Sequence, residues 1–270
     1  SLDILANRLA QEYVLTSVRP GKSQLIDNLL SDKKVITDAY RQFSRIAQDE
    51  LPLPYAAEWL LDNFFVVQQT IRQIRQDLPR GYYRELPKLS NPKWLTLPRS
   101  YAIACELIHY SENHLDIEQA ISFLRTFQAT VPLTMGELWA FPTMLRAGIL
   151  SSLAEALNQV MNPSTTDTLD DRVVRFCITS LRMLAVQDWK DFFESVSLVD
   201  EILRRDPTQV YALMNFKTRN SYRSAVERFA RAVKQPEESI AKQAIALSQA
   251  AIPDSRLGHV GYYLVGEGQR

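Results

Sequence analysis

Tyr55–Leu89 reads YAAEWLLDNFFVVQQTIRQIRQDLPRGYYRELPKL, and this stretch decides the fold class. Its first part carries an apolar residue at every third or fourth position, the spacing that places side chains on one face of an α-helix: Trp59, Leu60, Phe64, Val67, Ile71 and Ile74. Pro79 disfavours helix at the residue before it, and Gly81 suits a helix end. The helix is therefore predicted to stop near Leu78, and a compact second element is expected over 82–86.

The same helical pattern continues through the rest of the chain. Only eight glycines are present, and half of them fall near the C-terminal end, at Gly258, Gly261, Gly266 and Gly268. Asp116 with Gln119 and Thr134 with Glu137 have the spacing of capping boxes, and Ser31 with Asp32 is predicted to begin a helix after a short one over 25–30. We therefore predict an all-α bundle of many helices with short connections and an extended, Gly-rich C-terminal tail.

The domain boundaries are predicted from composition. The polar segment 162–171 contains Pro163 and three threonines, which is typical of a linker. We expect an N-terminal helical subdomain over 1–161, a second helical subdomain over 172–252, and a Gly- and Tyr-rich tail over 253–270.

Charge and composition exclude several classes of function. The chain has 31 basic and 31 acidic residues, so a general attraction to nucleic acid is not expected. No apolar run reaches the ~18–20 residues of a membrane-spanning helix. Cys105 and Cys177 are predicted to be buried free thiols. His109 and His114 have no third ligand at a metal-site spacing, so no metal site is predicted.

Acidic residues lie beside tryptophan three times, which suggests carbohydrate binding. Carboxylates accept hydrogen bonds from sugar hydroxyls, and aromatic rings cover the apolar face of a sugar. The candidate residues are Glu58, Trp59, Glu137, Trp139, Asp188 and Trp189. Two structural alternatives stay open: tryptophans anchor helix cores, and a capping glutamate such as Glu137 needs no further role.

A second candidate is a structural polar network around the organising helix: Asp62, Asn63, Arg84 and Glu85. Glu58 and Asp62 are four residues apart and share a helix face. Arg84 is expected to pair with one of these carboxylates and to hold the GYYRELP turn against the helix. Farther along the chain, the basic stretch 201–234 is interpreted as a solvated helix face, because Arg223, Glu227 and Arg231 recur at four-residue steps.

Several long stretches resemble one family. They are EWLLDNF with GYYRELPKL, PLTMGELWA, ITSLRMLAVQDWKDFFESVSLVDEILRRDP, VYALMNFKTRNSYRSAVERFAR and HVGYYLVGEG. Over nearly its whole length the chain resembles the region that precedes the transferase domain in bacterial cyclic β-1,2-glucan synthases. The segment 162–171 is shorter here than the corresponding segment is in that family.

The resemblance implies a non-catalytic helical module of a membrane glycosyltransferase that uses UDP-glucose with Mg²⁺ or Mn²⁺. The chain lacks an Asp-x-Asp motif and a Gln-x-x-Arg-Trp motif, so no catalytic residue and no cofactor is assigned to it. The expected partners are the transferase and membrane-embedded parts of the same polypeptide, and β-1,2-glucan. The expected location is the cytoplasmic side of the bacterial inner membrane, with this part of the protein soluble.

Two alternatives remain at the level of sequence. One is a small β-glucan hydrolase that uses Glu58, Asp62 or Glu137, since glycosidases need two carboxylates held across a cleft. The other is a helical adaptor that binds a protein partner through an exposed apolar surface. The module itself is expected either to bind glucan or to position the transferase.

Overall fold

The fold was analysed in a computed structural model, which describes residues 1–16, 24–162, 172–251 and 256–266. Over these ranges the chain forms fourteen α-helices and two short 3₁₀ helices, and only isolated β-bridges occur. The all-α prediction is therefore confirmed. None of the described helices is both long and apolar enough to cross a membrane.

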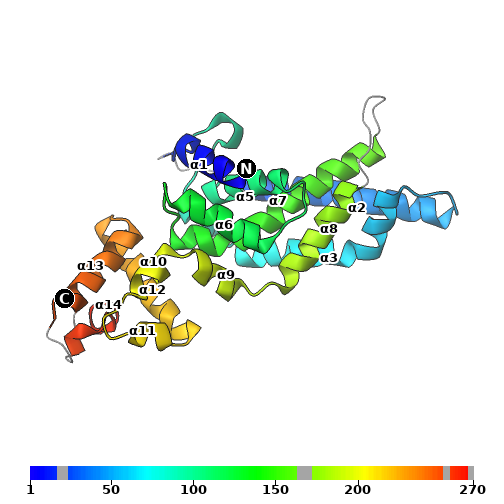
Figure 1. The fold of residues 1–270 in the computed structure, drawn as a ribbon. Helices are drawn as coiled ribbons and strands as arrows, with labels where there is room; N and C mark the ends of the chain where they lie inside the picture. The colour runs from blue at the N-terminus through cyan, green and yellow to red at the C-terminus, as the bar shows by residue number, and fades with distance from the viewer. Residues whose placement is uncertain (17–23, 163–171, 252–255, 267–270) are drawn as a thin grey trace. The chain divides into compact units, whose positions relative to one another are not determined.

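The chain divides into two compact units (Figure 1). Unit 1 contains residues 1–131 and 139–188, and unit 2 contains residues 132–138 and 189–270. The helix α7 begins in unit 2 and continues in unit 1. This division differs from the one expected, because α8, which follows the segment 162–171, lies in unit 1 and not in a second subdomain over 172–252. Most of that segment lies outside the described residues.

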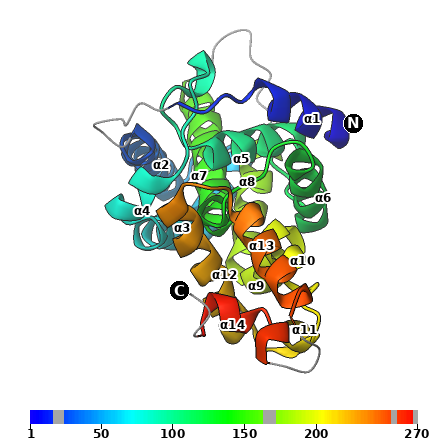
Figure 2. The ribbon, with the colours of Figure 1, turned by 90° about the vertical axis from the view of Figure 1, so that its left-hand side faces the viewer.

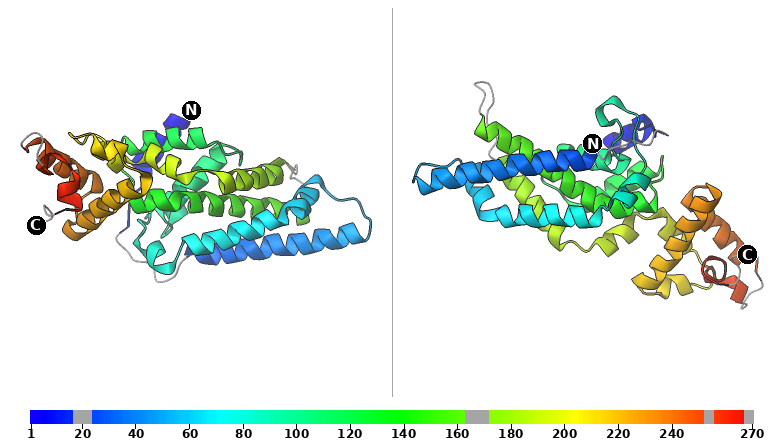
Figure 3. Two further views of the ribbon diagram at one scale, coloured as in Figure 1. Left: turned by 90° about the horizontal axis from the view of Figure 1, so that it is seen from below. Right: turned by 180° about the vertical axis from the view of Figure 1, so that it is seen from behind.

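Unit 1 is built around α7. Its helices are α1 (Leu2–Glu12), α2 (Gln24–Gln48), α3 (Tyr55–Asp77), α4 (Arg80–Glu85), α5 (Arg99–Tyr110), α6 (Ile117–Gln128), most of α7 (Met135–Met161) and α8 (Arg172–Val186), with the 3₁₀ helix η1 (Pro92–Trp94). Every residue from 141 to 150 is buried, so this part of α7 is covered on all sides. Figure 2 shows α1 against α6, and Figure 3 shows α2 and α3 running side by side.

The organising helix ends where it was expected to. α3 runs to Asp77, and the backbone N–H of Leu78 still donates to the Ile74 carbonyl. By contrast, the predicted break at Ser31 and Asp32 is wrong, since α2 is one continuous helix. Asp32 lies at helical spacing with buried Leu25, Leu29 and Ile36, so the apolar stripe passes through it. Burial raises the pKa of Asp32 to about 6, partly offset by a hydrogen bond with Ser151.

Unit 2 is a smaller helical cluster. It contains α9 (Trp189–Val196), α10 (Leu198–Leu203), α11 (Val210–Leu213), α12 (Phe216–Val233), α13 (Glu237–Gln249), η2 (Arg256–Gly258) and α14 (Gly261–Leu264). The helix α13 packs against α10 and α12, and α14 packs against both α12 and α13. Val260 and Leu264 are buried. The described part of the tail, 256–266, is therefore helical and packed, which differs from the extended tail expected.

The structure shows an N-cap at Asp116 and a complete capping box at Thr134 and Glu137. The Asp116 side chain accepts a hydrogen bond from the Gln119 amide at 3.0 Å, at the start of α6. At the start of α7, Thr134 Oγ1 accepts from the Glu137 amide at 3.2 Å, and Glu137 Oε2 accepts from the Thr134 amide at 2.9 Å. These bonds satisfy backbone donors that have no partner inside the helix.

Candidate functional site

The three acid–tryptophan pairs have different environments. Glu58 is exposed on α3, and Trp59 is half-buried with the ring of Tyr55 packed edge-on against it at 6.2 Å. Glu137 is fully buried in its capping box, and Trp139 is half-buried. Glu137 thus has a structural task that occupies its carboxylate.

The third pair lies where the two units divide. Asp188 is exposed and is the last residue of unit 1, whereas Trp189 is half-buried and begins unit 2. The ring of Trp189 packs edge-on against buried Phe192 at 5.2 Å, so this tryptophan contributes to the core of unit 2. Carbohydrate binding by these pairs stays a prediction.

The ion pair expected between Arg84 and the carboxylates of α3 is not formed in the described part of the chain. Asn63 is buried, but its side-chain amide donates to the Trp59 carbonyl of its own helix at 2.9 Å. Asp62, Arg84 and Glu85 are exposed, and no ion pair joins Arg84 to Asp62 or Glu58 in the described part of the chain. The reason is that α4 presents only Tyr83 to the core and directs its charged residues to solvent.

Lys88 holds the turn that Arg84 was expected to hold. Its Nζ donates to the carbonyl oxygens of Tyr83 and Leu86, each at 2.7 Å, and lies 4.6 Å from the centre of the Tyr83 ring. The side chain is 4% exposed, and burial lowers its pKa to about 8. The GYYRELPKL stretch is therefore fixed by its lysine, through backbone carbonyls and an aromatic ring.

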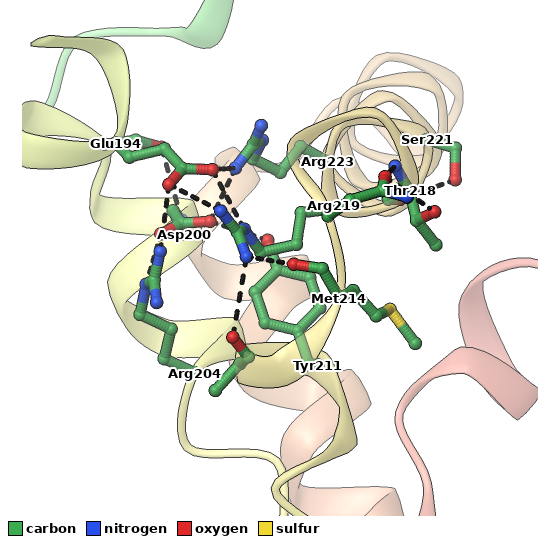
Figure 4. A network of polar contacts seen from close by, with 12 residues as sticks. Glu194, Asp200, Arg204, Tyr211, Met214, Thr218, Arg219, Ser221 and Arg223 are labelled. Carbon is green, nitrogen blue, oxygen red and sulfur yellow. Dashed lines mark hydrogen bonds and ion pairs between the residues drawn. The ribbon is translucent and has the colours of Figure 1, made fainter. Parts of the chain in front are cut away.

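The densest polar cluster of the described chain lies in unit 2 (Figure 4). Two carboxylates, Glu194 at the end of α9 and Asp200 in α10, face three guanidinium groups: Arg204, Arg219 and Arg223. Arg223 Nη1 lies 2.6 Å from Asp200 Oδ1 and 3.0 Å from Glu194 Oε1. The Tyr211 hydroxyl also donates to Asp200 Oδ1, at 2.7 Å.

The cluster joins α9, α10 and α12 with the α11 turn. Arg219 bonds both oxygens of Glu194, at 2.9 and 2.7 Å, and also donates to the carbonyl of Met214. Arg223 is fully buried between the rings of Phe193 and Phe216, with its guanidinium carbon 5.1 and 4.8 Å from their centres. Paired charges and aromatic faces stabilise the buried cation of Arg223, because an isolated buried charge is very costly.

The sequence interpretation of Arg223 is wrong. It was placed on a solvated ladder with Glu227 and Arg231, yet only the latter two form an exposed ion pair, at 2.7 Å. A usable signal was present: Arg223 precedes buried Val226 and Ala230 at helical spacing, on the apolar stripe of α12. The acidic partners of Arg223 come from two other helices, α9 and α10, and the sequence alone does not show that proximity.

A second cluster anchors the described part of the tail. Asp206 is fully buried and accepts from the Val260 amide at 2.9 Å, from Thr208 Oγ1 at 2.6 Å and from His259 Nδ1 at 2.9 Å. Burial alone would raise the pKa of Asp206, but these hydrogen bonds outweigh it and hold the pKa below its ordinary value. His259 Nε2 lies 3.2 Å from the Tyr222 hydroxyl, which completes the link to α12.

A half-buried acid, Glu237, caps the start of α7. Glu237 Oε2 accepts from the Met135 amide at 2.7 Å, so α13 caps the N-terminus of α7 within unit 2. Burial is the largest cause that raises the pKa of Glu237 to about 7, and the carboxylates of Glu227 and Glu137 add to it. This half-buried carboxylate is occupied by its hydrogen bond to the helix end.

The chemistry available to the described residues is limited. Glu194, Asp200, Asp206, Glu137 and Glu237 all accept hydrogen bonds from protein groups. No group of three His, Cys, Asp or Glu side chains that could hold a metal occurs over the described ranges. A hollow of about 150 Å³ on α12 is lined by Ser224, Glu227, Arg228 and Arg231, none of which belongs to the ion-pair cluster.

Both cysteines are free, as predicted. Burial raises the pKa of each thiol to about 12, so neither is a reactive thiolate at neutral pH.

The comparison with known proteins supports the family resemblance. The chain is 26% identical, over an alignment of 321 residues, to the cyclic β-(1,2)-glucan synthase NdvB of Rhizobium meliloti (strain 1021). The match covers 87% of this chain but only 11% of that relative. Since the alignment is longer than the 270 residues of this chain, the relative has additional residues inside the matched region. No family model matches the chain.

Proposed function

We propose that this chain is a non-catalytic helical module of a protein related to cyclic β-1,2-glucan synthases, and that it positions the other parts of that protein. The observation that carries this proposal is the extent of the match, which covers most of this chain and a small part of a named glucan synthase. A relationship over both helical units is what a module of such a protein would show.

The pairing of the guanidinium groups in the ion-pair cluster supports a non-catalytic role. Transfer of glucose from UDP-glucose requires the departing diphosphate to be neutralised by a metal or by accessible basic groups. The guanidinium groups of Arg219 and Arg223 are instead paired with Glu194 and Asp200. In this proposal UDP-glucose, with Mg²⁺ or Mn²⁺, is used by another part of the parent protein, on the cytoplasmic side of the bacterial inner membrane.

The geometry gives less support to the hydrolase alternative. A glycosidase holds two carboxyl groups on opposite sides of the scissile bond. Glu58 and Asp62 lie on the same exposed face of one helix, and Glu137 is buried in a capping box.

An adaptor that binds a separate protein partner would use the exposed apolar residues, of which Leu213 and Val186 are the most exposed.

A direct assay tests the proposal. The purified chain is incubated with UDP-glucose, Mg²⁺ or Mn²⁺ and a β-1,2-glucan primer, and released UDP is measured. We expect no release above the rate without protein. In a parallel incubation with glucan alone, we expect no new reducing ends. Steady release of UDP or of reducing ends that scales with protein and disappears in Glu58→Gln or Glu137→Gln would refute a non-catalytic role.

A further inference from the structure

The outer face of α3 carries an unusual combination of exposed side chains. Tyr55, Glu58, Asp62 and Phe65 follow one another at steps of three, four and three residues, so they form one continuous strip along the helix. Tyr55 is 46% exposed and Phe65 is 62% exposed. Single exposed aromatic residues are ordinary, but here two of them flank two carboxylates on the same face. We call these four residues the α3 strip.

The strip has groups that are free to bind a ligand. Glu58 and Asp62 form no ion pair in the described part of the chain, so their oxygens are open to solvent. Trp59 packs edge-on against the Tyr55 ring and supports its position. Tyr55 and Phe65 are ten residues apart on the helix, which is a distance of about 15 Å. A ligand that contacted both rings would have to be an extended chain.

The chemistry of the strip favours a chain of neutral sugars over a protein. The carboxylates accept hydrogen bonds from hydroxyl groups without needing a counter-charge, and the aromatic rings cover the apolar faces of sugar rings. A protein helix that docked here would place apolar side chains against two unpaired carboxylates, which is unfavourable on desolvation. The strip contains no aliphatic residue to offset that cost.

We propose that the α3 strip is a surface site for a chain of β-1,2-linked glucose. The linkage rests on the proposed function, whereas the preference for a neutral sugar chain rests on the strip itself. The site would hold a glucan chain weakly and without reaction. It would bring a growing or finished chain to this module while the chemistry occurs elsewhere in the parent protein.

Titration calorimetry with a β-1,2-linked glucose oligosaccharide tests the proposal on the whole chain. We expect saturable binding that weakens roughly tenfold in Phe65→Ser and in Tyr55→Ser, the loss of one good aromatic contact in each case. Glu58→Ala and Asp62→Ala should also weaken binding. The matched control is Tyr110→Ser, because Tyr110 is also 46% exposed but lies on α5. Circular dichroism should show the same helix content in every variant, since all the substituted residues are exposed.

Two results would overturn the proposal. One is the absence of binding, or binding that is unchanged in Phe65→Ser and Tyr55→Ser. The other is self-association of the chain, seen by sedimentation and removed by Phe65→Ser, because the strip would then bind a second copy. Neither result depends on the UDP-release assay, so a chain that binds no glucan and releases no UDP would refute this site while the proposed non-catalytic role stood.

Discussion

Arg223 is expected to contribute to the stability of unit 2 through the ion-pair cluster. It is fully buried and bonds both Glu194 and Asp200. Asp200 is buried and Glu194 is half-buried, and Arg204 also bridges them. Replacing Arg223 by methionine removes the buried one of these two bridging guanidinium groups, which should reduce the free energy of unfolding by roughly 3–5 kcal/mol. Urea denaturation of Arg223→Met against the parent measures this change.

Arg231→Met is the matched control on the same helix. Arg231 pairs with Glu227 but is 61% exposed, and an exposed pair at this spacing contributes about 0.3–0.5 kcal/mol. The control should therefore stay close to the parent. Equal losses in the two variants would mean that the cluster around Arg223 does not carry the stability of unit 2.

Lys88 should make stability depend on pH in the alkaline range. Its folded-state pKa is lowered to about 8 by burial, from an ordinary value of 10.5. Between these values the unfolded chain binds a proton that the folded chain lacks, so the free energy of unfolding rises with pH from about 8 to about 10.5. Denaturation at several pH values should show this rise for the parent relative to Lys88→Met. Parallel curves for the two proteins would mean that the ammonium is not desolvated in the fold.

Arg223 and Lys88 show how much of a single residue's environment can be predicted from the sequence. The spacing of Arg223 with Val226 and Ala230 would have placed it on a buried stripe, but its acidic partners come from α9 and α10. Lys88 donates to backbone carbonyls, and every residue has such a carbonyl, so the side-chain pattern does not indicate these partners. Burial could be predicted from local spacing, whereas the identity of the partners could not.

At the scale of elements, α14 depends on a glycine. A Cβ at Gly261 would clash with the Tyr222 hydroxyl and would lie 2.7 Å from His259 Nε2, the two groups that join the tail to α12. Gly261→Ala should destabilise the protein by about 1–3 kcal/mol, the usual cost of overpacking. Amide exchange should become faster at residues 259–264, because α14 would no longer pack against α12.

Gly81→Ala is the control for this substitution. Gly81 lies in α4, and a Cβ there meets no atom within 4 Å. Alanine favours helix over glycine by up to about 1 kcal/mol, so this variant should be as stable as the parent or slightly more stable. If Gly261→Ala behaved in the same way, the packing of α14 against Tyr222 and His259 would be wrong.

Elements were predicted well wherever their signal was local. The end of α3, the N-cap of α6 and the capping box of α7 follow from a proline and from pairs of polar residues three apart. Ser31 and Asp32 also looked like a cap, but the apolar stripe of α2 continues through them, and tertiary packing overrides the local preference. The helical structure of the described part of the tail, 256–266, could not be predicted locally, because its anchor, Asp206, lies more than fifty residues away in sequence.

At the scale of the whole molecule, the chain divides into two compact units, each with its own core. Denaturation followed by two spectroscopic signals should therefore distinguish their unfolding. Trp59, Trp94 and Trp139 belong to unit 1, whereas Trp189 belongs to unit 2. Tryptophan fluorescence therefore reports mainly on unit 1, and far-ultraviolet circular dichroism reports on the helices of both. A chain whose units unfold at different denaturant concentrations will give transitions that do not coincide.

Arg223→Met should separate the two transitions. The substitution weakens only unit 2, so the dichroism signal should begin to fall at a lower urea concentration while most of the fluorescence change stays near its parent midpoint. The start of α7 lies in unit 2 and its remainder in unit 1, which couples the two cores through one helix. If that coupling were strong enough to make the chain a single cooperative unit, both signals would shift together by the full loss of stability, and the division into two energetically separate units would be refuted.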